Sequence, residues 1–421
     1  MGPMRTPDLA VARDLCTFIA ASPSPFHAVE QVAVRLGAAG FDASIGAADG
    51  FVRRGGSIVA WRRGPGPIEQ FRLMGAHTDS PNLRIKPRAD RRSAGFRQLG
   101  VEVYGGVLLN SWLDRDLGLS GRLSVSRGSR IDEVLFRVDR PVLRIPQLAI
   151  HLDRDVNERG LVLNRQQHLS PLWGMADGAD FRTFVAAAAG VDASAVVAWD
   201  AMCHDLAPPT LAGVSDEFVS SPRIDNQLSC HAAVSALAAA STPPRGVAIG
   251  FVLFDHEEVG STTDRGAAGA FLANVLERVA LTSGADRATY LAALSRSICV
   301  SADCAHGTHP NYTELHEPDH WIALNGGPVI KLNTSARYAT ESTTAAVFVR
   351  ACEEAGVPTQ WFVTRSDLAC GSTIGPLTAA QLGMATVDVG VAQLAMHSCR
   401  EMAGSADPGW FIAALEAFFA R

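Results

Sequence analysis

The sequence feature that most constrains the fold of this chain is an apolar run followed by four consecutive ionisable residues. Residues 247–254 have the length and the β-branched content of a buried strand, and the segment Asp255-His-Glu-Glu258 follows directly. Two adjacent carboxylates at the end of a core strand are costly unless a cation meets them. Because open α/β sheets build their sites at the carboxyl ends of strands, the segment is a candidate functional site. A solvated acidic turn is the alternative interpretation.

Composition narrows the class of protein. A chain of 421 residues is too long for one ordinary core, so two or more domains are expected. The net charge of -6 gives no reason to expect a nucleic-acid partner, and no apolar run approaches the length of a membrane helix. The eight cysteines form no CxxC pair, which favours reduced thiols, and the N-terminus has no secretory signal. We expect a soluble, cytoplasmic protein.

Two kinds of secondary-structure pattern occur along the chain. Residues 1–88 and 215–421 alternate strands with helices, which predicts an α/β domain, doubly wound around a mostly parallel central sheet. Residues 89–214 contain short alternating segments typical of a small antiparallel domain, followed by two alanine-rich helical stretches within 181–201. We interpret this block as an inserted, mainly β domain.

Imidazoles and carboxylates follow several of the expected strands or open a turn before a helix. This mixture suits zinc, cobalt or manganese, and a two-metal site needs a bridging carboxylate and about two further ligands per ion. The set supplies five ligands and one spare glutamate. His256-Glu-Glu-Val-Gly260 is not an HExxH motif, because Gly260 cannot ligate a metal, and P-loop and GxSxG motifs are absent. The alternatives are a satisfied structural histidine, a helix cap or a surface residue. The set comprises His77, Asp79, Asp225, Glu257, Glu258, Asp303 and His397.

Five ordered segments resemble the aspartyl aminopeptidase family, whose members are dinuclear metallo-aminopeptidases. The resemblance runs from Ser22-Pro-Ser-Pro-Phe-His27 to the C-terminal helix and implies release of an N-terminal aspartate or glutamate from peptides. It also implies a homo-oligomer, a dodecamer built from dimers through the inserted domain. The segments are Gly75-Ala-His-Thr-Asp-Ser-Pro81, Ser221-Pro-Arg-Ile-Asp-Asn226, Asp255-His-Glu-Glu-Val-Gly-Ser261, Ser301-Ala-Asp-Cys-Ala-His306 and Ala395-Met-His-Ser398.

The resemblance also implies a role for each residue of the set. Asp225 would bridge two zinc ions per subunit, Glu257 would be the general base, and Asp79 would orient a ligating imidazole. Cobalt or manganese are alternatives to zinc. The remaining ligands would be His77 and Asp303 on one ion, and Glu258 and His397 on the other.

Selectivity for an acidic side chain requires a fixed cation near the metals. Lys331, at the end of an expected strand, is the candidate, and a strand-end lysine that reaches solvent is the alternative. His306 is a candidate for the same pocket. In the family a histidine of the inserted domain reaches a neighbouring subunit's site, and His151 alone can take that part because position 147 is Gln.

A second departure from the family lies beside the expected base. The chain has His256 where the family commonly has Asn, a change that could alter metal affinity or the pH optimum without removing a ligand.

Two further functions remain open from the sequence. One is a related dinuclear hydrolase with another substrate, such as a neutral aminopeptidase or a deacylase, which differs in the role of Lys331. The other is a catalytically silent shell that binds peptides or partners. A missing ligand or base would mark such a shell, and neither is missing.

Overall fold

The chain divides into two compact units. In the computed structural model, which describes residues 8–175 and 177–421, the first unit extends to Asp79 and takes in Pro209–Met396 and Glu401–Arg421. The second comprises Ser80–Pro208 and His397–Arg400. From the sequence, the inserted domain was expected to comprise residues 89–214, with residues 1–88 and 215–421 forming the other domain. None of the helices in these described ranges has the length and apolar content to span a bilayer.

The first unit is built on an eight-stranded mixed sheet. Its four central strands run parallel, and antiparallel pairings join them to the strands on either side. This mixed α/β fold confirms the expected class, because the parallel strands form the centre of the sheet. In order, the strands are β1 (Asp49–Arg54), β2 (Ser57–Arg63), β12 (Val247–Phe254), β3 (Gln70–His77), β13 (Ile298–Ala302), β17 (Ala385–Gly390), β15 (Val329–Leu332) and β16 (Gln360–Val363).

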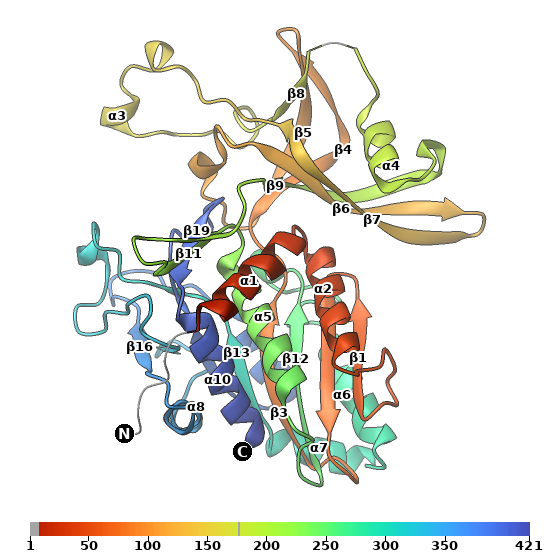
Figure 1. Ribbon diagram of the computed structural model, residues 1–421, viewed down its shortest axis with the longest axis vertical. Coiled ribbons are helices and arrows are strands. Elements are labelled where there is room, and N and C mark those ends of the chain that lie inside the picture. Colours follow the sequence, from red (N-terminus) through yellow and green to blue (C-terminus); the bar gives the residue numbers. More distant parts are fainter. Residues whose placement is uncertain (1–7, 176) are drawn as a thin grey trace. The chain divides into compact units, whose positions relative to one another are not determined.

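Helices cover both faces of this sheet, as Figure 1 shows. Strand β12 explains why, since Phe251 and Leu253 pack into one apolar core and Val252 and Phe254 into another. One face is covered by α1 (Leu9–Ala21), α2 (Pro25–Ala38), α5 (Ile224–Ala239), α8 (Ser342–Ala355) and α10 (Asp407–Ala420). The other is covered by α6 (Phe271–Thr282), α7 (Arg287–Ser295) and α9 (Ile374–Leu382).

Local signals identified most of these elements. Asp8 caps α1 by accepting a hydrogen bond from the backbone N–H of Ala10 at 2.8 Å. Helices α7 and α9 were not predicted. A small five-stranded sheet was also missed, because its strands have two to four residues. They are β10 (Thr210–Ala212), β11 (Phe218–Ser221), β19 (Glu401–Gly404), β18 (Ala392–Leu394) and β14 (Ala305–His306).

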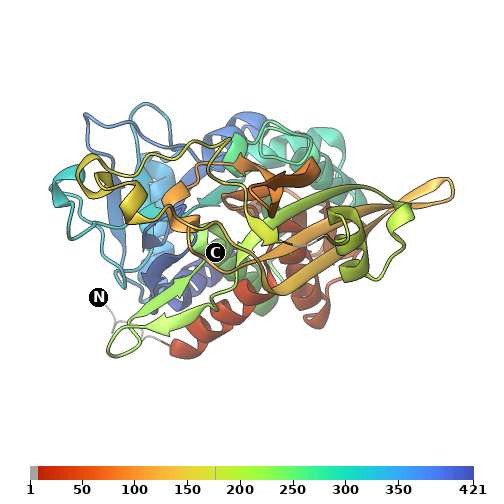
Figure 2. The ribbon, with the colours of Figure 1, turned by 90° about the horizontal axis from the view of Figure 1, so that it is seen from above.

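The second unit is mainly β and has its own apolar core. Its six-stranded sheet includes the long hairpin of β6 and β7, which can be followed in Figures 1 and 2. In order, the strands are β7 (Arg130–Leu143), β6 (Leu117–Arg127), β9 (Val196–Asp205), β4 (Asn82–Ser93), β5 (Phe96–Tyr104) and β8 (Leu172–Gly174). Its α-helices are α3 (Val156–Arg159) and α4 (Phe181–Ala189).

One prediction for the second unit is wrong. Residues 181–201 were expected to form two helices, but only α4 forms, and it ends at Gly190 in the left-handed conformation. Strand β9 occupies the second stretch and pairs with β6 along most of its length. The pairing buries Val196, Ala201 and Cys203, so tertiary contacts outweigh the helical propensity of the alanines.

Candidate metal centre

The carboxyl ends of the parallel strands bring the candidate ligands of the first unit together. His77 is the last residue of β3, Asp303 follows β13, and Glu257 begins the short 3-10 helix Glu257–Val259 after β12. Asp225 lies at the start of α5. The sequence argument from strand ends therefore locates these four residues at one edge of the sheet.

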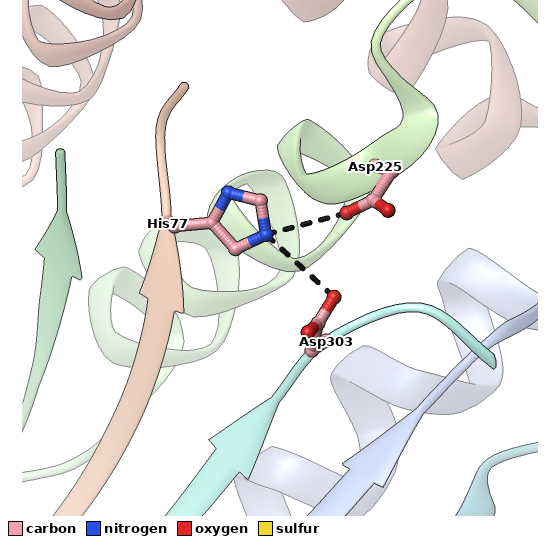
Figure 3. Close-up of side chains that lie close together, drawn as sticks. All are labelled: His77, Asp225 and Asp303. Carbon is pink, nitrogen blue, oxygen red and sulfur yellow. Dashed lines mark ion pairs between the residues drawn. The ribbon is translucent and has the colours of Figure 1, made fainter. Parts of the chain in front are cut away.

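His77 lies at the centre of this group, facing Asp225 and Asp303 (Figure 3). Its Nε2 atom is 3.3 Å from Oδ1 of Asp225, 3.6 Å from Oδ1 of Asp303 and 3.9 Å from Oε2 of Glu257. His77, Asp225 and Asp303 are buried, and Glu257 is largely buried. One imidazole nitrogen thus shares a small volume with three carboxylates.

Two sets of these atoms have the spacing of metal ligands. Donor atoms of His77, Asp225 and Asp303 lie within 4.8 Å of one another, and so do donor atoms of His77, Glu257 and Glu258. Nitrogen and carboxylate oxygen donors suit zinc. Among the described residues, His77 is the sole ion-pair partner of Asp303 and of Glu257, so a dication would supply the positive charge that this acidic group lacks. The donor set therefore fits zinc.

Electrostatics within the group are strongly perturbed. Burial lowers the pKa of His77, but hydrogen bonds with Asp225, Asp303 and Asp79 outweigh it and hold that pKa well above its ordinary value. Burial, together with the charges of neighbouring carboxylates, raises the pKa of Glu257 to about 8, although the charge of His77 lowers it. Groups shifted in this way are typical of functional sites.

Asp79 contacts His77 and also the backbone of the two adjacent glutamates, Glu257 and Glu258. Nδ1 of His77 lies 3.0 Å from the backbone oxygen of Asp79, which can only accept, and 3.4 Å from its carboxylate Oδ1. With Nδ1 of His77 turned toward Asp79, its Nε2 faces the carboxylates of Asp225 and Asp303. The carboxylate of Asp79 also accepts hydrogen bonds from the backbone N–H groups of Glu257 and Glu258, both at 3.2 Å. That second role was not predicted, because backbone donors leave no signal in the sequence.

Asp225 is held by two residues that the sequence analysis did not single out. Helix α5 begins at Ile224, and the backbone angles of Asp225 are not helical, with φ -79° and ψ 107°. The backbone N–H of Asp225 donates to Oε2 of the buried Glu401 at 2.9 Å. The side chain of Asn226 donates to the backbone oxygen of Ala302 at 2.7 Å, which joins the start of α5 to the end of β13.

His256 adopts the left-handed conformation, with φ +67°. Its Nδ1 lies 2.9 Å from Oγ1 of Thr263, and its Nε2 lies 3.5 Å from Oδ2 of the buried Asp255. Asn tolerates positive φ better than most residues, so the side-chain contacts of His256 fix a turn that Asn would adopt more readily. The turn carries Glu257.

Lys331 is a buried cation beside this group. Its side chain is 3% exposed, its Nζ donates to the backbone oxygen of Cys304 at 2.7 Å, and it lies 5.4 Å from the ring centroid of Tyr338. Within the described part of the chain it forms no ion pair with a carboxylate. His306 is exposed on β14, with its ring edge-on to Phe362. His306 follows Asp303 along the chain, and Lys331 on β15 reaches the backbone oxygen of Cys304, the residue after Asp303.

The two remaining candidates belong to the second unit. His397 has φ +65° and lies in the turn between β18 and β19, where its Nδ1 is 3.0 Å from the backbone oxygen of Gly106. Because that oxygen can only accept, Nδ1 is the donor. His151 is exposed in the 3-10 helix Ile150–Leu152. The predicted roles of both stay predictions.

Comparisons with known proteins identify one family. Residues 18–419 match the family described as aminopeptidase I zinc metalloprotease (M18). A probable M18 family aminopeptidase 2 of Mycobacterium leprae is 50% identical, over 97% of this chain and 98% of its own. The protein of the same description from Streptomyces coelicolor is 48% identical, over 96% of each chain.

Solved structures agree with the sequence match. The cryo-EM structure of the Ape4 and Nbr1 complex aligns with a TM-score of 0.92 at 35% identity, covering 99% of this chain and 87% of that one. The S. cerevisiae mApe1 dodecamer aligns with a TM-score of 0.84 at 27% identity, covering 98% and 96%. The resemblance seen in the sequence motifs is thereby confirmed, and the chain belongs to the M18 family of zinc metallo-aminopeptidases.

Proposed function

We propose that this aminopeptidase removes an N-terminal aspartate or glutamate from peptides, with two zinc ions per subunit. The observation that carries the specificity is Lys331. A buried ammonium group without a carboxylate partner is costly, and the acidic side chain of a substrate would supply that partner. The ammonium group of Lys331 contacts the backbone oxygen of Cys304, the residue after Asp303, so the acidic side chain would bind while the peptide bond lies near the metals.

The ligand assignment is the one that the family resemblance implies. His77 and Asp303 would complete one ion, Asp225 would bridge, and Glu258 with His397 would complete the other. The spacing of the donor atoms around His77 supports the first ion. Asp79 would hold His77 and the backbone of the adjacent glutamates in register through the three contacts described above.

Glu257 would move the proton. Bound zinc supplies a Lewis acid and lowers the pKa of a water molecule from about 16 toward 7. A carboxylate of Glu257 would accept the proton of that water at Oε2 and return it to the amine that leaves. Positioned proton transfer of this kind contributes about 10²–10⁴ in rate. The fixed backbone of Glu257 supports its role, since Asp79 restrains the turn from which the side chain projects.

Other contacts of the substrate would come from two histidines. His306 would line the pocket for the acidic residue, because β14 directly follows Asp303. His151 would act in the site of a neighbouring subunit. The S. cerevisiae relative is a dodecamer, and we propose the same assembly here, built from dimers through the second unit. The exposed apolar side chains Ile150 and Leu152, on either side of His151, support a protein–protein contact at this position.

Hydrolysis of four chromogenic amides tests the proposal. Protein stripped of metal with a chelator is assayed on aspartyl, glutamyl, leucyl and lysyl amides before and after zinc is added. We expect zinc-dependent cleavage confined to the two acidic amides. Zinc-dependent cleavage of leucyl or lysyl amides would retain the chemistry and overturn the pocket, as for a neutral aminopeptidase. Absence of cleavage with zinc bound would favour a deacylase or a silent binder.

A further inference from the structure

A second charged cavity lies in the first unit, at the opposite ends of the strands that carry the candidate ligands. It has a volume of about 380 Å³ and is formed by the start of β3, the turn between α7 and β13, the first turn of α8 and the end of α10. Helices α8 and α10 run side by side here (Figure 1). Among the described residues that line the cavity are Arg72, Arg296 and Arg421, and none of the lining side chains is a carboxylate.

Arg72 is partly enclosed, as is Arg421, whereas Arg296 is exposed. Arg72 is half-buried on β3, and its Nη1 donates a long hydrogen bond, 3.4 Å, to the backbone oxygen of Phe419. No carboxylate in the described part of the chain pairs with it. Burial and the positive charge of Arg421 both lower the pKa of Arg72. A half-buried guanidinium beside a second positive charge is unfavourable unless an anion binds between them.

The other two arginines reach the cavity from separate elements. Arg296 is exposed in the turn before β13, and its Nε donates to the backbone oxygen of Glu69 at 3.1 Å. It too has no carboxylate partner within residues 8–175 and 177–421. Arg421 pairs with the exposed Glu354, with Nε 3.0 Å from Oε2. Two of the three guanidinium groups at this cavity therefore lack a neutralising partner.

The first turn of α8 adds donors and further positive potential. Thr343 and Thr344 line the cavity at the start of this helix of 14 residues. Glu341 and Thr344 form a capping box, so the hydroxyl of Thr344 is engaged. The hydroxyl of Thr343 forms no hydrogen bond with any described residue. Helix N-termini favour anions through their free N–H groups and the helix dipole.

We propose that this cavity binds a phosphate group, either as the free ion or as a phosphomonoester. Guanidinium groups match tetrahedral oxyanions through paired N–H donors, and the three arginines supply them from three directions. The volume lies within the range of small-molecule sites, so the group can carry a small organic substituent. The proposal does not rest on peptidase specificity, because none of these residues belongs to the candidate metal centre.

Isothermal titration calorimetry of the zinc-loaded full chain tests the site, with inorganic phosphate and glycerol 2-phosphate as probes. Phosphate also has affinity for zinc, so the measured quantity is the difference between the wild type and R72Q/R296Q. We expect each single variant, R72Q or R296Q, to weaken phosphate binding about tenfold or more, since each removes charge-assisted hydrogen bonds. Raised salt should weaken binding to the wild type more than to the double variant.

R278Q is the matched control, because Arg278 is exposed on α6 of the same unit and lies away from the cavity. It should bind both probes as the wild type does. Arg296 is exposed, so R296Q keeps the test valid even if R72Q disturbs folding. Binding of glycerol 2-phosphate as well as phosphate would assign the site to esters, and binding of phosphate alone would assign it to the free ion. Equal isotherms for wild type and R72Q/R296Q, or no heat with either probe, would refute the site.

Discussion

At the scale of single residues, Glu257 has the position of a proton-transferring carboxylate. It is largely buried, its Oε2 lies 3.9 Å from Nε2 of His77, and its backbone is fixed by Asp79. We expect E257Q to lower kcat by about 10²–10⁴ while leaving the zinc content unchanged, because the amide keeps the shape but cannot accept a proton. Zinc is measured by atomic emission beside the kinetic assay. E353Q, an exposed glutamate on α8, is the control; a fully active E257Q would refute the role of base.

Lys331 determines specificity in this proposal, and its loss should separate substrates. In K331M the apolar stem is kept and the charge is removed, so kcat/KM for aspartyl and glutamyl amides should fall about tenfold to a hundredfold. Hydrolysis of leucyl amide should be unchanged or faster, because the pocket no longer holds an unpaired cation. The measurement is the ratio of kcat/KM values within one preparation, which cancels losses of folded protein. An unchanged ratio would show that acidic selectivity lies elsewhere.

At the scale of secondary-structure elements, the sequence predicts where a residue lies along a strand better than it predicts which residues the side chain contacts. His77 and Asp303 were found because they end apolar strands, and the strand ends of a parallel sheet meet. The second role of Asp79 and the support from Glu401 were missed, because a backbone hydrogen bond depends on tertiary placement and not on residue type. Strand β9 was mistaken for a helix for the same reason, since pairing with β6 decides its conformation.

Asp407 links helix α10 to the loop that contains Asn325 and Gly327, and its ionisation should affect stability. It lies buried in the first turn of α10 and accepts hydrogen bonds from the backbone N–H groups of Asn325 at 2.7 Å and Gly327 at 2.9 Å. Burial raises its pKa to about 7, and the two hydrogen bonds oppose that shift. Because the folded state holds the proton more tightly than the unfolded state, this stabilisation is complete below about pH 4. It is lost as the pH rises through about 7.

The D407N variant has no carboxyl group at this position. A comparison of wild type with D407N therefore isolates the effect of Asp407 ionisation on stability. From pH 5 to pH 8 the free energy of unfolding should fall more in the wild type than in D407N, by at most about 3 kcal/mol. Urea unfolding at the two pH values measures the difference. D42N, which changes an exposed carboxylate of the same unit, should follow the wild type. Parallel pH profiles for wild type and D407N would show that Asp407 is ionised throughout or contributes nothing.

At the scale of the whole molecule, the proposed assembly would connect the exposed apolar residues of the second unit with activity. Leu152 is 75% exposed and Ile150 is 47% exposed, and both flank His151. If this segment contacts a neighbouring subunit, burial of these side chains favours assembly, and a charge at either position opposes it. L152E should therefore lower the molar mass in solution, and the activity should fall with it, because His151 no longer reaches a neighbouring site.

H151A separates these two effects. It should retain the mass of the wild-type assembly and still lose activity, whereas L152E loses both. V214E is the control for a charge at an exposed apolar position, since Val214 is fully exposed in the first unit. Light scattering after size-exclusion chromatography gives the mass, and aspartyl amide hydrolysis gives the activity. A wild type that runs as a 44.6 kDa monomer would refute the assembly. A fully active H151A in an intact assembly would refute only the contribution of His151 to a neighbouring site.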